Sequence, residues 1–132
     1  MKEIASGLRF PEGPIAMPDG SILVVEMLGG TLLRLWGDNR QEVVAELGGG
    51  PNGAAIGPDG ACYVCNNGGS EPSPDCTQWI PPEPVKGSPG RIERVNLATG
   101  KVERLYDMVD GHGLAAPNDI VFDRDGGFWF TD

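Results

Sequence analysis

The chain has 132 residues and a net charge of −9 at pH 7, and 21 glycines and 12 prolines make up a quarter of it. This length predicts a single domain over residues 1–132, and this composition favours short strands joined by tight turns over long helices. The acidic balance disfavours nucleic-acid binding, and because we find neither an apolar run long enough to span a membrane nor a signal peptide, we expect a cytoplasmic protein that does not bind membranes.

Three segments of the chain repeat one pattern. Each begins with proline and a polar residue, reaches Asp-Gly eight residues after the proline and continues as an alternating apolar run. The segments are 11–27 (PEGPIAMPDGSILVVEM), 51–67 (PNGAAIGPDGACYVCNN) and 117–132 (PNDIVFDRDGGFWFTD). Asp-Gly between apolar runs predicts a tight hairpin, because glycine readily adopts the positive φ that such turns require. The expected strand pairs are 13–17 with 21–27, 54–57 with 61–67, and 120–122 with 128–131.

Two more strands follow each of the first two hairpins, at 31–36 and 41–47 and at 91–97 and 101–107. Each complete unit therefore has four antiparallel strands, and the first two Asp-Gly turns lie 40 residues apart. Such a period is typical of a β-propeller blade. We expect an all-β fold, a β-propeller with one blade at about 11–47, a second at about 51–107 and the beginning of a third at 117–132.

The second repeat interval is 26 residues longer than the first, and the additional residues lie within 67–90. This insertion is rich in proline, glycine and serine, so we expect a loop that covers one mouth of the fold; whether it acts as a lid stays open. Residues 2–8 are expected to form the outer strand that closes the ring. Because only two and a half blades are present, we expect the N-terminal part of a longer protein, and its open blade edges favour self-association.

The polar residue that follows the first proline is equivalent in the three repeats. It is Glu12, Asn52 and Asn118 in turn, and three oxygen-bearing side chains at one repeat position are expected to point into one shared space. Carboxylate and amide oxygens are the ligands that calcium and magnesium prefer. Asp119 and Asp132 are candidate proton acceptors near such a metal. Each of the three repeat residues also has a plainer interpretation, as a solvated or capping side chain in a turn.

The sulfur and imidazole groups do not form an obvious metal site. Cys62 and Cys65 lie three residues apart in an expected strand, so their side chains face opposite sides and cannot easily bind one metal. Together with Cys76 they are interpreted as small buried residues and reduced thiols. His112, the only histidine, lies between glycines just before the third repeat, where it is a candidate for the mouth of the site or a solvated loop residue.

The strand pattern also places several large side chains. Trp36 and Trp129 lie in apolar strands and are expected in the core. Trp79 lies in the insertion, where it is a candidate to line the mouth of a pocket. The alternation at residues 91–94 (RIER) predicts one solvated strand face with charge pairs within the sheet.

Five short motifs resemble those of the senescence-marker-protein/gluconolactonase/luciferin-regenerating-enzyme-like family. They are FPEGP at 10–14, VCNNGG at 64–69, GRIERV at 90–95, PND at 117–119 and FTD at 130–132, so the resemblance covers almost the whole chain. It implies a six-bladed propeller with a divalent metal near the central axis and the hydrolysis of lactones. Calcium is the metal we expect first, with magnesium and zinc as alternatives.

The same resemblance implies that Glu12 is a metal ligand and that Asn118 binds the substrate or a water near the metal. The other metal ligands of the family, an Asn and an Asp, belong to the fourth and fifth blades, outside these 132 residues. Some members carry an arginine two residues before the third-blade asparagine, where this chain has Ala116.

The resulting hypothesis is a metal-dependent hydrolase of small lactones. Glu12 is predicted as metal ligand, Asn118 and Asp119 as catalytic residues, and Asn52, Asn118 and His112 as substrate-binding residues. The alternatives are a non-catalytic propeller scaffold and an inactive partial chain that holds a structural metal. Apart from the metal, a small-molecule lactone is the only partner that the hypothesis requires.

Overall fold

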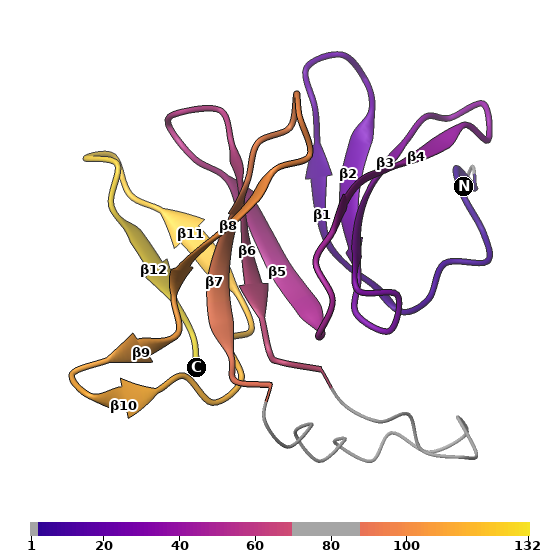
Figure 1. The fold of residues 1–132 in the computed structure, drawn as a ribbon. Helices are drawn as coiled ribbons and strands as arrows, with labels where there is room; N and C mark the ends of the chain where they lie inside the picture. Colours follow the sequence, from indigo (N-terminus) through magenta and orange to yellow (C-terminus); the bar gives the residue numbers. More distant parts are fainter. Residues whose placement is uncertain (1–2, 70–87) are drawn as a thin grey trace, which may run out of the picture.

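The computed structural model describes residues 3–69 and 88–132, and every regular element within these ranges is a strand (Figure 1). The first antiparallel sheet consists of β1 (Pro11–Ala16), β2 (Ile22–Glu26), β3 (Thr31–Leu35) and β4 (Gln41–Glu46). The second consists of β5 (Pro51–Ile56), β6 (Cys62–Asn66), β7 (Arg91–Val95) and β8 (Val102–Tyr106). A small hairpin of β9 (Met108–Val109) and β10 (His112–Gly113) precedes a third unit, the hairpin of β11 (Ile120–Phe122) and β12 (Phe128–Phe130). The described part of the chain contains no helix that could cross a membrane.

The two Asp-Gly turns of the complete sheets form where the repeat predicts them, and the aspartates hold them in shape. Asp19 accepts hydrogen bonds at Oδ1 from the backbone N–H and the hydroxyl of Ser21, at 2.9 and 2.6 Å. Asp59 accepts one from the N–H of Ala61 at 3.1 Å. The glycine after each aspartate has a positive φ, +82° and +77°, a conformation that glycine adopts without steric strain.

Two apolar clusters join the three units. The first contains residues of both four-stranded sheets: Leu23, Val25, Leu32, Ala45, Leu47, Cys62, Val64 and Val95. The second joins the second sheet to the β11–β12 hairpin through Cys65, Ile92, Leu114 and Ile120. At the edge of the second cluster the rings of Tyr63 and Phe122 meet edge to face, with centroids 4.9 Å apart. The side chains of β6 alternate between the two clusters, as successive residues of a strand must.

The placement of Cys62 and Cys65 confirms the prediction that they face opposite sides of the sheet, because each belongs to a different cluster. Both are free, buried thiols. Burial raises the pKa of each thiol to about 12, and the charges of Asp119 and Asp132 add to the effect at Cys65. Cys76 and Trp79 lie outside the described residues, as does most of the insertion predicted at 67–90.

The expected closing strand at residues 2–8 is not formed, since residues 3–8 have no regular secondary structure. Instead Ala5 and Leu8 pack against the outer face of the first sheet, where Val24, Leu33 and Leu35 form a buried cluster. Covering these three apolar side chains removes them from water, which favours this arrangement.

The prediction of a solvated face at residues 91–94 is wrong. Arg91 and Glu93 are only 5% and 4% exposed, and they form an ion pair with 2.6 Å between Nε and Oε1. Arg94, on the other side of the strand, forms an exposed pair with Asp59 at 2.6 Å. The pattern of residues 91–94 correctly predicts a strand with two faces, but the face that carries Arg91 and Glu93 is buried and not solvated.

The tryptophan predictions are also not met. Trp129 is 70% exposed on the β11–β12 hairpin, although its strand is apolar. Trp36 is only partly buried, and the guanidinium of Arg40 lies 4.9 Å from the centre of its ring, a cation–π contact at the protein surface.

Candidate functional site

The structure brings the three equivalent repeat residues to one pocket. Glu12 lies at the start of β1, Asn52 at the start of β5 and Asn118 just before β11, and these strands begin at the same end of the molecule (Figure 1). The pocket has a volume of about 290 Å³. It is lined by Glu12, Gly13, Pro14, Asn52, Gly53, Ala54, Asn118 and Asp119, and we call it the site pocket.

Irregular strand pairing accompanies the first two of these positions. The pairing of β1 with β2 shifts register between Glu12 and Ile15, and that of β5 with β6 shifts between Pro51 and Ala54. Asn52 therefore lies inside the second irregularity. An extra residue in one strand bends it and redirects its side chains, which is why such bulges are common beside functional sites.

The units approach each other closely at the glycines that follow Glu12 and Asn52. A Cβ atom on Gly13 would lie 2.8 Å from the backbone oxygen of Asn52, and one on Gly53 would lie 2.7 Å from the Cα of Asp119. The Gly53 N–H also donates to the backbone oxygen of Asn118 at 2.6 Å. Because no side chain separates the backbones, the residues before these glycines line one pocket.

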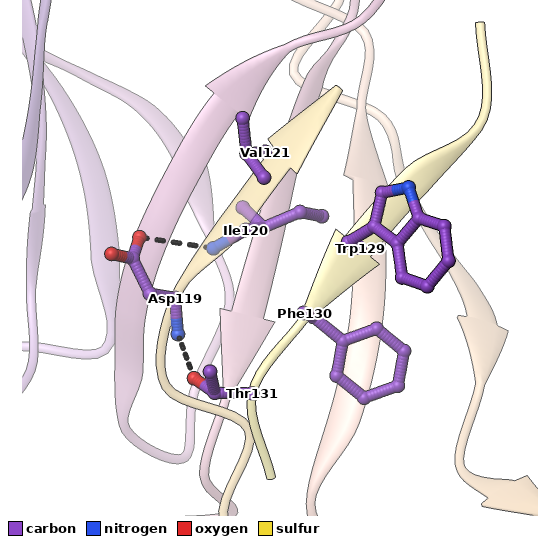
Figure 2. A pocket seen from close by; sticks show the side chains of 6 residues that line it. All are labelled: Asp119, Ile120, Val121, Trp129, Phe130 and Thr131. Carbon is purple, nitrogen blue, oxygen red and sulfur yellow. Dashed lines mark hydrogen bonds between the residues drawn. The ribbon is translucent and has the colours of Figure 1, made fainter. Parts of the chain in front are cut away.

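The third repeat has Asp119 where the first two have glycine. Its Oδ1 accepts the N–H of Ile120 at 2.9 Å, and its own N–H donates to the hydroxyl of Thr131 at 3.1 Å (Figure 2). The N–H of Asn118 donates to the backbone oxygen of Thr131 at 2.9 Å. These bonds hold Asn118 and Asp119 in place, and the exposed carboxylate of Asp119 stays accessible from solvent.

A second pocket of about 210 Å³ lies on the same hairpin and is mainly apolar (Figure 2). Asp119 and Thr131 line it together with Ile120, Val121, Trp129 and Phe130. Asp119 thus borders both pockets, one polar and one apolar.

His112 does not line the site pocket. It lies on β10, exposed, with Nδ1 3.1 Å from the backbone oxygen of Asp110. Its role in substrate binding therefore stays a prediction.

The sequence analysis missed a second set of equivalent residues, Glu26, Asn66 and Asp132, which we call the anchor residues. Each lies seven residues after the aspartate of its Asp-Gly turn. Each accepts hydrogen bonds from backbone N–H groups of the segment that leads into the first strand of its own unit. Their constant distance from Asp-Gly was the signal available in the sequence.

The contacts of Asp132 do not support its candidacy as a proton acceptor. Its Oδ2 accepts the N–H of Ala115 at 3.0 Å, and its Oδ1 accepts the N–H of Ala116 at 2.8 Å. Both carboxylate oxygens thus bind backbone, and Asp132 does not line the site pocket. Of the two candidates, Asp119 is the one the structure places there.

The side chains of the site pocket fit a hard cation in their chemistry. Glu12 and Asp119 offer carboxylate oxygens, and Asn52 and Asn118 offer amide oxygens, which suit calcium or magnesium better than zinc. Among residues 3–69 and 88–132 no three His, Cys, Asp or Glu side chains gather closely enough to hold a metal. A metal at this pocket would therefore depend on amide oxygens as well as carboxylates.

Residues 10–132 match the family described as SMP-30/gluconolactonase/LRE-like region. A gluconolactonase from Zymomonas mobilis subsp. mobilis is 24% identical over 143 residues, an alignment that covers 98% of this chain and 35% of that protein. This similarity agrees with the motifs quoted above and extends over nearly the whole chain.

Two solved structures share the fold. A gluconolactonase from Xanthomonas campestris has a TM-score of 0.70 and 22% identity, covering 95% of this chain and 35% of its own. A virginiamycin B lyase from Staphylococcus aureus has a TM-score of 0.64 and 17% identity, covering 96% and 36%. The chain spans about a third of the length of these relatives. The predicted β-propeller architecture of four-stranded antiparallel blades is confirmed.

Proposed function

The chain belongs to the SMP-30/gluconolactonase/LRE-like family, and we propose that it forms part of a cytoplasmic, calcium-dependent hydrolase of small lactones. One observation carries the proposal: Glu12, Asn52 and Asn118, from three successive repeats, line a single pocket. The gluconolactonase names of its relatives support this substrate class. Because the chain spans about a third of their length, the proposal includes further ligands from residues beyond these 132.

The residues of the site pocket have distinct proposed roles. Glu12 holds the cation with its carboxylate, and Asn52 contributes an amide oxygen. When bound, the cation supplies Lewis-acid polarisation of the lactone carbonyl and lowers the pKa of bound water. Asn118 orients the substrate or the attacking water by hydrogen bonding.

Asp119 is the proposed proton acceptor, because it is exposed at the pocket and adjacent to Asn118. As water adds to the carbonyl carbon, its proton passes to the Asp119 carboxylate. The ring C–O bond then breaks, and the same proton passes to the leaving alkoxide. The product is the open-chain hydroxy acid, and Asp119 returns to its ionised state.

The test begins with the polypeptide isolated from its source cells, whose intact mass shows whether it extends beyond Asp132. That polypeptide is assayed on a panel of small lactones, with chelator and after calcium is restored. We expect hydrolysis to be lost with chelator, to return with calcium, and to fall strongly in Glu12→Gln. Glu42→Gln, an exposed change on β4, is the matched control.

Two outcomes would contradict the proposal. Hydrolysis that is equal in Glu12→Gln and unaffected by chelator would exclude the metal mechanism. Calcium binding without hydrolysis of any lactone would favour the scaffold alternative, in which the metal is structural.

A further inference from the structure

Asn66 is the anchor residue of the middle unit, and it is completely buried at the end of β6. Its Oδ1 accepts the N–H of Gly50 at 2.9 Å and the N–H of Gly68 at 3.0 Å. Its Nδ2 donates to the backbone oxygen of Gly48 and to Oε2 of Glu93, both at 2.9 Å. An amide side chain has two donor hydrogens and an oxygen with two lone pairs, so all four hydrogen-bonding positions are used.

The buried ion pair fixes which way the amide of Asn66 faces. Glu93 accepts the Nε–H of Arg91 at Oε1 and the Nδ2–H of Asn66 at Oε2. Arg91 in turn donates to the backbone oxygen of Leu47 at 3.0 Å. Because the carboxylate of Glu93 needs a donor, Nδ2 must face it and Oδ1 must face Gly50. An aspartate at position 66 would present an oxygen to Glu93, with two carboxylates in contact.

The chain that follows Gly50 runs directly into the site pocket, which Asn52 and Gly53 line. Between Gly50 and Asn52 lies only Pro51, which is fully buried and whose ring fixes its φ. The next residue, Gly53, donates to the backbone oxygen of Asn118. The backbone of Asn52 also lies against Gly13, the residue after Glu12. The Asn52–Gly53 segment is thus in contact with the site residues of both neighbouring repeats.

We propose that Asn66 is a positioning residue for the site pocket: by holding the Gly50 N–H it fixes Asn52 and, through Gly53, Asn118. The anchors of the outer units are carboxylates, Glu26 and Asp132, whereas the middle unit is packed on both faces and uses a neutral amide. The effect on metal binding rests on the proposed function; the effect on geometry does not.

The test uses the polypeptide at the length found in the source cells, labelled with ¹⁵N, without metal or substrate. In the wild type the Gly50 N–H is expected to exchange slowly with solvent. In Asn66→Asp we expect this exchange to be at least about tenfold faster and the side-chain amide resonances of Asn52 to shift, while the protein stays folded. Asn96→Asp is the matched control, because Oδ1 of Asn96 accepts the N–H groups of Ala98 and Thr99, which an aspartate oxygen also does.

A second measurement adds calcium to the same three proteins. Loss of a residue that orients a metal ligand typically lowers affinity by about 10–100-fold, and we expect this in Asn66→Asp and not in Asn96→Asp. If the wild type binds no calcium, the proposed function fails and the resonance measurement still decides the positioning role.

The proposal is overturned by rapid exchange of the Gly50 N–H in the wild type, or by a folded Asn66→Asp whose Asn52 resonances do not move. If Asn66→Asp does not fold, Asn66→Ser, which removes the Nδ2 donors and is too short to reach Gly50, replaces it. The results expected of Asn66→Asp, and those that would overturn the proposal, then apply to Asn66→Ser without change.

Discussion

Glu26 and Asp132 occupy the same position in their repeats and make the same kind of contact. Oε1 of Glu26 accepts the N–H of Arg9 at 2.7 Å, and the two carboxylate oxygens of Asp132 accept the N–H groups of Ala115 and Ala116. In both units the donors lie just before the proline of the repeat, Pro11 or Pro117, and proline has no N–H of its own. A carboxylate at the end of the second strand (Glu26) or two residues beyond it (Asp132) therefore holds the chain just before the site residue.

This contact makes Glu26 important for stability. Its Oε2 also accepts the hydroxyl of Thr31 at 2.8 Å, in the interior. We expect Glu26→Ala to lower the free energy of unfolding by about 1–3 kcal/mol, because the Thr31 hydroxyl and the Arg9 N–H both lose their acceptor. Urea denaturation measures this change. Glu42→Ala, at an exposed position, should change the unfolding free energy little; equal effects of the two substitutions would contradict the anchoring role.

The close approach at Gly53 predicts that a single methyl group is harmful there. A Cβ atom would meet the backbone of Asn118 and Asp119, which cannot move aside as a flexible side chain does. We expect Gly53→Ala to destabilise the fold by about 1–3 kcal/mol, as measured by urea denaturation. In Gly113→Ala the new Cβ would meet only one atom, at 3.9 Å, so this control should be tolerated. If Gly53→Ala is as stable as the wild type, the units can move apart at this position without a loss of stability, which would contradict the prediction.

The buried thiols should be unreactive in the native protein. Burial raises the pKa of Cys62 and Cys65 to about 12, so almost no thiolate is present at pH 8, and the thiolate is the reactive form. We expect neither residue to be alkylated by iodoacetamide at pH 8 until the protein is unfolded in urea. Mass spectrometry of the peptides assigns the label to each cysteine, and rapid native labelling of either residue would contradict its burial.

The same shifts predict that stability falls at alkaline pH. An unfolded thiol ionises above about pH 8.5, whereas the folded thiols keep their protons up to about pH 12. Between these values the native state binds more protons than the unfolded state, so the free energy of unfolding decreases as pH rises. The urea midpoint should therefore fall between pH 8 and pH 10, and Cys62→Ala combined with Cys65→Ala should reduce this pH dependence. If the urea midpoint of that variant falls just as steeply with pH, titratable groups other than these two thiols cause the pH dependence.

The outer face of the β11–β12 hairpin should cause self-association of the 132-residue chain. Val121 and Trp129 are partners across the two strands and are 61% and 70% exposed. Exposed apolar patches of this kind favour association. Sedimentation velocity over a range of concentrations should show oligomers that Trp129→Gln reduces. Val43→Gln, an exposed apolar position on β4, is the control; a monomer at every concentration would contradict the prediction.

Most of the strand arrangement could be predicted from the sequence, because local chemistry governs it. Alternating apolar residues specify strands, and Asp-Gly at positions 19 and 59 specifies tight turns wherever the strands are packed. The repeat also identified Glu12, Asn52 and Asn118 as equivalent, and the structure places all three around one pocket. Equivalent positions in stacked units must lie close together, so this part of the site needed no tertiary information.

Only the tertiary structure decided which face of each strand is covered. Arg91 and Glu93 flank the apolar Ile92 as residues of a solvated face would, yet they are buried because the neighbouring sheet lies against that side. Trp129 shows the reverse, an apolar residue left exposed. The bonds of the anchor residues likewise join segments that are far apart in the chain, such as Gly50 and Asn66. Alternation of residue types along a strand shows that the strand has two faces. Which face is buried depends on how whole units pack against each other, and this packing is a property of the assembled fold.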